Sequence, residues 1–346
     1  MMGEEIWRKS VELWKRGQKL DPEEARFLDG WLQSLQNRKE QINQDNKKLD
    51  NAKKNFDGIS VVIPVYNRAH LLDITLPTLY EKKFAGQLEI VVVDDRSTDN
   101  TEEVVERHNS KCGVIRYIKI KKGHIPKLNP EYIQHIQGST DNIHINGNHA
   151  INVGVKRSKY DLILLTGAEI YHIANTLQMF YDKHRENNFD WLWIGSYGAC
   201  EIAGDSYDKR ELLRHAHEDF LNQKQVDEKW FEKWKFSCRY CENPHCVSFT
   251  KTPFYLIHGY DEDDYGWGWG DLEFNERMKN IGVRYINIPE PPNIMWVHLY
   301  HSLLELADGG TYNRLMAADK RLRNSPDDFF SIKGNMRNLN EWGILE

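Results

Sequence analysis

Acidic and imidazole side chains that follow short apolar runs are the residues of this sequence most able to do chemistry. A carboxylate at the end of a buried strand can hold a divalent cation or accept a proton, and a nearby histidine can complete a metal site. The candidates lie in separate stretches of the 346 residues and are Asp94, Asp95, Glu169, Asp271, Glu273, His298 and His301.

The first stretch predicts a strand, a helix and a second strand. Ile59–Val65 and Glu89–Val93 are β-branched runs that end in polar, turn-forming residues, which is typical of buried parallel strands. His70–Lys83 carries leucine and isoleucine at the three- and four-residue spacings of a covering helix. Ligands bind at the carboxyl ends of such strands, where Asp94 and Asp95 stand. Taken alone, the paired aspartates would also fit a turn that caps the next helix.

The combination of Val61–Arg68 with Ile90–Thr101 closely resembles the nucleotide-binding half of glycosyltransferase family 2 and its relatives with the GT-A fold. The resemblance extends from Ile59 to about His301 and implies an α/β fold with a mostly parallel, twisted, Rossmann-like sheet. It also implies UDP as the nucleotide. Asn152 and Gly154 match the family's Asn-x-Gly helix. The residues implied in nucleotide binding are Pro64, Tyr66, Arg68, Asp94, Asp95 and Asn152.

The sequence departs from this family after the run Leu162–Leu165. The family has Asp-x-Asp there, and its last carboxylate binds the cation that bridges the nucleotide phosphates; this chain has Gly167, Ala168 and Glu169 instead. The first acid is lost and the last is longer by one methylene. We expect Glu169 to hold Mn²⁺, with Mg²⁺ as the alternative. His172 is either a further ligand or a hydrogen-bonded neighbour of the site.

The second stretch, Trp267–Phe274, is similar to the Trp-Gly-Gly-Glu-Asp-x-Glu-Phe type of motif of beta-1,4-galactosyltransferases, chondroitin-polymerising enzymes and polypeptide N-acetylgalactosaminyltransferases. The resemblance implies that Asp271 is the catalytic base and that Glu273, which is retained beside it, is a second catalytic residue. The indoles of Trp267 and Trp269 would form walls for sugar rings. The alternative is a Gly-Trp turn with a capping aspartate. The preceding Asp261–Asp264 reads as a solvated acidic loop, with a metal cluster as the alternative.

The third stretch contains His298 and His301, and a histidine here looks like the second metal ligand of these transferases. His298 is the first choice and His301 the second. In an extended segment the two side chains would point to opposite faces, so one of them would be structural.

The rest of the chain frames this core. We expect residues 1–55 to form a helical extension, 56–301 the GT-A domain and 302–346 a helical tail. The N-terminal helices pack on the domain or dock a second copy. No apolar run is long enough to span a bilayer and no signal-peptide core is present, so the expected location is cytoplasmic. A net charge of −6 argues against a nucleic-acid partner. Cys238, Cys241 and Cys246 form a compact cluster that is either reduced or a zinc site.

These features predict an inverting, metal-dependent glycosyltransferase. It would move a hexosyl or N-acetylhexosaminyl group from a UDP-sugar to a hydroxyl acceptor in glycan or surface polysaccharide synthesis. Two alternatives stay open: a retaining transferase or donor hydrolase on the same fold, and a silent nucleotide- or carbohydrate-binding protein, which the altered Asp-x-Asp suggests. A protein, a lipid-linked glycan or modified phage DNA are the other acceptors to consider.

Overall fold

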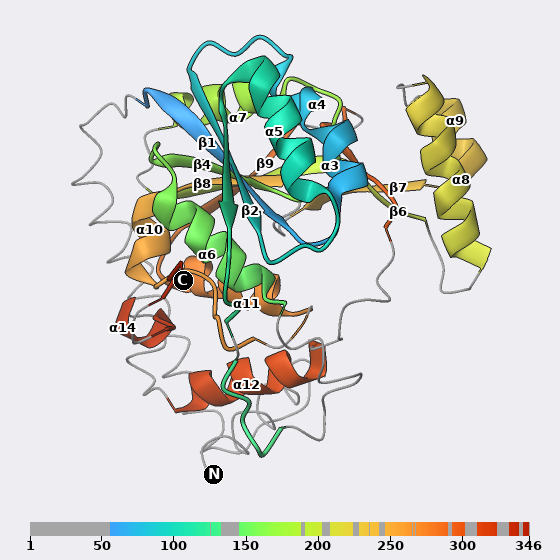
Figure 1. The fold of residues 1–346 in the computed structure, drawn as a ribbon. Helices are drawn as coiled ribbons and strands as arrows, with labels where there is room; N and C mark the ends of the chain where they lie inside the picture. The colour runs from blue at the N-terminus through green and yellow to red at the C-terminus, as the bar shows by residue number, and fades with distance from the viewer. Residues whose placement is uncertain are drawn as a thin grey trace, which may run out of the picture.

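The fold is built on one twisted sheet covered by helices on both faces (Figure 1). The computed structural model describes residues 56–124, 126–132, 145–187, 191–202, 208–223, 228–234, 236–241, 246–264, 266, 268–289, 293–301, 310–323, 332–338 and 342–345. The predicted N-terminal helices of residues 1–55 lie outside these residues.

The described residues contain ten strands in a single sheet of order β3-β2-β1-β4-β8-β6-β10-β5, with β7 and β9 also paired to β6. The strands are β1 (Gly58–Val65), β2 (Gln87–Asp94), β3 (Ile115–Lys119), β4 (Leu162–Thr166), β5 (Ile170–His172), β6 (Leu192–Ile202), β7 (Phe236–Cys241), β8 (Cys246–Thr250), β9 (Arg284–Ile288) and β10 (Trp296–His298).

The first four strands of the sheet order are parallel, as the sequence predicts for a nucleotide-binding half. Val65 lies beside Asp94 in the register of β1 and β2, so the polar residues after both strands meet at one edge. Beyond β4 the sheet is mixed, because β8 runs antiparallel to both β4 and β6. The predicted α/β sheet is confirmed, and its parallel part positions the candidate site.

Helices cover the two faces of the sheet with separate cores (Figure 1). On one face, α3, α4, α5 and α7 pack on the side of β1 that carries Val61 and Ile63. On the other, α6, α10 and α11 pack on the side that carries Val62. The bounds of these helices are α3 (Ala69–Thr75), α4 (Pro77–Tyr80), α5 (Thr101–Cys112), α6 (Gly147–Arg157), α7 (Thr176–Glu186), α10 (Lys251–Leu256) and α11 (Gly270–Asn280).

One glycine explains how closely α6 approaches the sheet. A Cβ at Gly154 would lie 2.5 Å from Cγ1 of Val62 and 2.9 Å from Cγ2 of Val93. Only a residue without a side chain lets the helix settle on both strands. The Asn-x-Gly pattern therefore has a packing reason that holds whatever the protein binds.

The four remaining helices lie at two ends of the molecule: α8 (Asp208–Gln223), α9 (Glu228–Trp234), α12 (Gly310–Leu322) and α14 (Ile332–Asn335). In Figure 1, α8 and α9 stand beside β6 and β7, while α12 and α14 lie next to α11. The tail is part of the main core, since Trp342 is buried against Phe254. Among the described helices, none has the length and hydropathy needed to cross a membrane.

The structure describes only part of the predicted cysteine cluster. Cys246 is buried in β8. The side chains of Cys238 and Cys241, like all of His245, lie outside what the structure describes. A zinc site at these cysteines stays an untested prediction.

Candidate active site

The loops that follow β1 and β2 are tied together by side-chain hydrogen bonds. Asp94 accepts from the backbone N–H of Ser97 at 2.7 Å and from the hydroxyl of Tyr117. The side-chain oxygen of Asn67 accepts from the N–H of Thr98 at 2.8 Å. Burial, followed by the hydrogen bond to Asp94, raises the pKa of the Tyr117 phenol, so it stays a donor. The result is a fixed rim at the carboxyl edge of the sheet.

Asp95 connects this rim to α6. Its Oδ2 accepts from the N–H of Asn146 at 2.7 Å, and its Oδ1 pairs with Nε of Arg96 at 2.9 Å. Burial raises the pKa of the Asp95 carboxyl, although both contacts oppose that shift. Three half-buried residues lie at the end of the neighbouring strand β1 and just after it: Pro64, Tyr66 and Arg68.

The side chain of Asn152 makes contacts other than the nucleotide contact that the resemblance implies. It is fully buried; its amide donates to the carbonyl of Tyr260 at 2.8 Å and to Oε1 of Glu262 at 2.9 Å. Its oxygen accepts from the N–H of Tyr260 at 2.8 Å. Both amide protons and the oxygen are used within the protein. Direct nucleotide binding by Asn152 does not fit this geometry, and we assign it to positioning the Tyr260–Glu262 backbone.

Glu169, His298 and His301 come together beyond the ends of β4 and β10. Their ligand atoms all lie within 4.8 Å of one another. Nε2 of His298 is 3.9 Å from Oε1 of Glu169, and the two imidazole rings are 5.2 Å apart. The condition for His298 and His301 to point to opposite faces, an extended segment through both, is not met, because β10 ends at His298 and both side chains reach the same cluster.

Two further contacts fix this cluster. The N–H of Leu299 donates to the carbonyl of Glu169 at 2.8 Å, which joins the two segments through their backbones. Nη2 of Arg68 lies 3.4 Å from Nδ1 of His301. Arg68 thus places a guanidinium between the rim at β1 and the cluster, which is suitable for a diphosphate.

The altered Asp-x-Asp has a steric explanation. A Cβ at Gly167 would lie 2.7 Å from Cδ of Glu169 and closer still to Oε1. The glutamate carboxylate therefore occupies space that any side chain at position 167 would need. A side chain at position 167 would require the Glu169 side chain to move, so the two positions are sterically coupled.

His172 does not belong to this cluster. It is 1% exposed and lies between the hydroxyls of Thr166 and Thr176, at 3.3 and 3.2 Å. Burial lowers the pKa of its imidazole to about 3, so it is neutral at physiological pH. Of the two alternatives for His172, the hydrogen-bonded neighbour is the one that the structure supports.

The Trp-Gly segment leads into α11, where Asp271 lies in the first turn and is half-buried. Trp269 precedes the helix with a positive φ of 67°, which is strained for a residue with a side chain. Its indole N–H is buried and has no hydrogen-bond partner among the described residues. Trp267 lies outside the described residues.

Glu273 is committed to a buried ion network. Nε of Arg277 lies 2.7 Å from its Oε1, and Nη2 of Arg337 lies 2.9 Å from the same oxygen. The side chains of Glu273 and Arg337 are 3% and 5% exposed. This arrangement does not fit the predicted catalytic role of Glu273 and gives it a structural one, holding α11 to the tail.

The acidic run before the motif is also buried, so its description as a solvated loop is wrong. Asp261, Glu262 and Asp264 are each at most 4% exposed. Asp261 pairs with Lys320 of α12. Glu262 contacts two histidines, His124 and His149, that the sequence analysis did not single out. Their partners are far away along the chain, so local charge density could not predict the burial.

The donor set of Glu169, His298 and His301 suits a divalent ion. One carboxylate and two imidazoles are ligands that Mn²⁺ and other transition metals accept. Glu169 and His298 are each 17% exposed, so a nucleotide phosphate could reach an ion that they hold. The residues present therefore fit the metal that the resemblance implies.

Comparison with known proteins gives family matches at two separate segments of the chain. Residues 60–129 match Glycosyl transferase family 2, and residues 229–302 match the N-terminal domain of galactosyltransferase. The first segment contains the rim at β1 and β2, and the second contains Asp271 and both cluster histidines. The resemblance inferred from the sequence motifs is confirmed.

Among curated proteins, the chain is 24% identical to a chondroitin synthase of Escherichia coli, over 67% of this chain and 34% of that protein. It is 25% identical to a validoxylamine A glucosyltransferase of Streptomyces hygroscopicus subsp. jinggangensis, over 65% of this chain and 52% of that one. The chain thus spans about a third to a half of these relatives. The crystal structure of S. aureus TarS superposes with a TM-score of 0.50 at 15% identity, over 80% of this chain and 42% of that chain. That likeness confirms the fold.

Proposed function

We propose that this chain, with the fold and both motif segments of a GT-A glycosyltransferase, transfers a sugar from a nucleotide-sugar to a hydroxyl acceptor with inversion. The observation that carries the proposal is the convergence of Glu169, His298 and His301 next to Arg68, at the edge where Asp94 ends β2 and Asp95 follows it. A cation site and a nucleotide rim at the same sheet edge are what a nucleoside diphosphate donor requires.

The donor would bind with its base against the rim formed by Pro64, Tyr66 and Asp95, and UDP is the nucleotide that the resemblance favours. Arg68 would contact the diphosphate. Glu169, His298 and His301 would hold a divalent ion, most simply Mn²⁺, which supplies charge neutralisation for the departing diphosphate.

Asp271 would be the base. It lies in the first turn of α11, where the helix dipole stabilises its ionised form. As the acceptor oxygen attacks the anomeric carbon, its proton passes to the Asp271 carboxylate. The bond from that carbon to the diphosphate oxygen breaks and the electron pair leaves with the nucleotide. The Trp269 indole N–H would donate to a sugar or phosphate oxygen, which would satisfy that buried donor.

The relatives named above suggest a polysaccharide or a small polyol as acceptor, and the transferred group would be a hexosyl or N-acetylhexosaminyl unit. A catalytically silent binder is the second candidate. It is favoured by the missing first carboxylate of Asp-x-Asp at Gly167.

Calorimetric titration of UDP with and without Mn²⁺ tests the site. We expect binding by the wild type that requires the ion and is lost in Glu169→Ala. Glu186→Ala, an exposed glutamate of α7, is the matched control and should bind as the wild type does. Binding that ignores both Mn²⁺ and Glu169 would contradict the metal site, and no binding of UDP would direct the search to another nucleotide.

Turnover separates the two candidate functions. With a donor that binds, Asp271→Asn should keep nucleotide affinity and lower kcat by about 10²- to 10⁴-fold, because only proton transfer is removed. Glu276→Gln, on the same helix and paired with Arg321, is the control that should retain activity. Nucleotide binding without any turnover in the wild type, across a panel of donors and acceptors, would favour the silent binder. Retention at the anomeric carbon would contradict the role of Asp271.

A further inference from the structure

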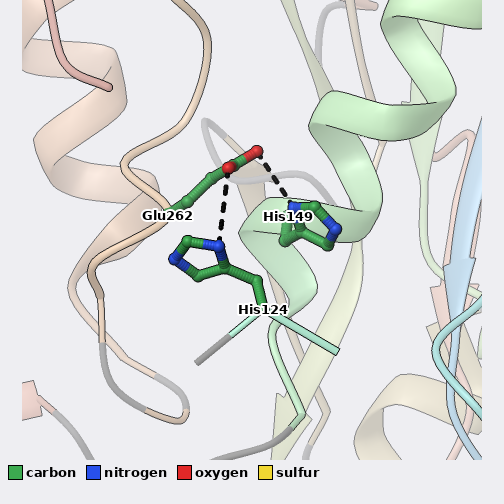
Figure 2. Close-up of side chains that lie close together, drawn as sticks. All are labelled: His124, His149 and Glu262. Carbon is green, nitrogen blue, oxygen red and sulfur yellow. Dashed lines mark ion pairs between the residues drawn. The ribbon is translucent and has the colours of Figure 1, made fainter. Parts of the chain in front are cut away.

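A second cluster of metal-binding side chains lies on the α6 side of the nucleotide rim. It consists of His124, His149 and Glu262, whose ligand atoms all lie within 4.8 Å of one another (Figure 2). The three residues come from the loop after β3, the first turn of α6 and the loop before the Trp-Gly segment. Figure 2 shows both imidazoles directed at the two oxygens of one carboxylate.

The distances are close to those of a metal site without its ion. Nδ1 of His149 is 3.1 Å from Oε1 of Glu262, and Nδ1 of His124 is 3.9 Å from Oε2. The two rings are stacked, with centroids 5.4 Å apart. Ligand atoms that share a tetrahedral ion at about 2.0–2.1 Å are separated by little more than 3 Å, so small side-chain movements would complete the site.

The histidines lack the hydrogen bonds that a purely structural role would supply. Nδ1 of His149 and Nε2 of His124 are buried without a hydrogen-bond partner among the described residues. The side chain of His149 is 5% exposed. A buried ring nitrogen that makes no hydrogen bond is costly. A cation beside Glu262 would remove that cost for Nδ1 of His149, whereas His124 would coordinate it through Nδ1 and not through Nε2.

The surrounding residues orient the ligands as an outer shell does. Asn152 and the N–H of Gly343 donate to Oε1 of Glu262, at 2.9 and 2.8 Å, which fixes the carboxylate with Oε1 beside His149 and Oε2 facing His124. Oδ1 of Asp263 is 3.9 Å from Nε2 of His124. Metal-bound histidines usually present their other nitrogen to such a carboxylate.

We propose that His124, His149 and Glu262 bind one divalent transition-metal ion, with Zn²⁺ the favoured ion. Two imidazoles and one carboxylate form a common three-residue zinc set that leaves a fourth position for water. The ion would join three segments that are distant in the sequence. It would hold the Asp261–Gly270 loop against Asn146, whose N–H binds Asp95. The proposal does not rest on the glycosyltransferase function.

The competing explanation is an ion pair between a charged imidazole and Glu262 with no metal. Zinc stoichiometry separates the two. The full-length chain, stripped with a chelator, is dialysed against buffered micromolar ZnCl₂ and its zinc content per chain is measured. We expect His124→Ala and Glu262→Gln each to lose one ion per chain, or to bind it about 100-fold more weakly, since even outer-shell changes cost 10- to 100-fold.

Matched controls make the result specific. His70→Ala removes an exposed histidine and should keep the wild-type zinc content. Glu169→Ala should not abolish the ion that His124→Ala removes, which separates this cluster from Glu169, His298 and His301. Any zinc held by cysteines is the same in every variant and cancels in the comparison.

Co²⁺ in place of Zn²⁺ gives a second readout. Its visible absorption should report four-coordinate nitrogen and oxygen ligation in the wild type, and this signal should disappear in His124→Ala. His124 is in a loop and its side chain is 30% exposed, so this variant should fold, and circular dichroism checks that it does. Wild-type zinc content and affinity in folded His124→Ala and Glu262→Gln would overturn the proposal.

Discussion

At the scale of single residues, Gly167 and Glu169 share one space at the proposed metal site. The importance of Gly167 is more than the absence of a carboxylate. The Glu169 carboxylate lies in the space that a side chain at position 167 would occupy. By sequence alone, Gly167 and Glu169 are two separate departures from Asp-x-Asp. In the structure they are linked, because the Glu169 carboxylate lies where a Cβ at position 167 would be.

This coupling predicts the effect of a single methyl group. Gly167→Ala should push the Glu169 carboxylate away from His298 and weaken Mn²⁺ binding by about 10-fold, an effect of about 1.4 kcal/mol. Because Gly167 has ordinary backbone angles, stability should change little. Calorimetric Mn²⁺ titration with a thermal melt measures both quantities. Ala168→Gly, which removes a methyl beside it, should leave Mn²⁺ affinity unchanged; equal affinity in Gly167→Ala would contradict the steric coupling.

The buried imidazole of His172 should make the folding stability of the protein sensitive to acid. Its folded-state pKa is lowered to about 3, against about 6.5 when unfolded, so below pH 6.5 only the unfolded chain takes up the proton. Stability is therefore complete above pH 6.5 and is lost as the pH falls towards 3. At pH 5 the loss is about 2 kcal/mol.

Urea unfolding at pH 7.5 and pH 5 measures this loss. His172→Gln should lose about 2 kcal/mol less than the wild type between the two values, since it has no proton to take up. His70→Gln, at an exposed position, should lose as much as the wild type. Identical losses in His172→Gln and the wild type would mean that other groups govern the acid response.

At the scale of elements, α11 is held from the tail side by buried charges. Glu273 in its first turn pairs with Arg277 and Arg337, and further along the helix Glu276 pairs with Arg321 of α12. The first turn also carries Asp271, so the same contacts that anchor the helix orient the proposed base. This anchoring explains why an acid two residues from the base is buried and not free to react.

The two arginines of the tail should differ sharply in their contributions. Arg337→Met leaves a buried carboxylate with one partner fewer and should lower the free energy of unfolding by about 3 kcal/mol. Arg321→Met breaks a pair whose side chains are 27% and 39% exposed and should cost about 0–1 kcal/mol. Chemical denaturation compares them directly, and similar costs for both would contradict the burial argument.

At the scale of the whole molecule, the sequence predicts the parallel half well and the mixed half poorly. The apolar runs of β1, β2 and β4 end in polar residues, so both their direction and their exposed edge can be inferred. β5 is three residues long and β8 runs antiparallel between β4 and β6, and neither feature leaves a local pattern.

The candidate site follows the same division. Glu169, His298 and Asp271 stand at positions that the family resemblance marks, so the motifs alone point to them as candidates. The burial of Asp261 and Glu262 depends on Lys320, His124 and His149, which are brought to them only by the tertiary fold. Sequence alone shows only the chain neighbours of a charged run. Here the residues that pair with the charges are distant in the chain, so their burial could not be predicted.

The contact of Gly343 with Glu262 has a consequence for the order in which the molecule is made. The ribosome delivers β1 and the nucleotide rim early, yet the carboxylate of Glu262 gains one of its hydrogen bonds only when residue 343 emerges. Trp342 likewise covers Phe254 at that late moment. A nascent chain can therefore form its parallel sheet before the loop that precedes α11 has made its contact with Gly343. The proposed catalytic half is then the last part of the fold to form.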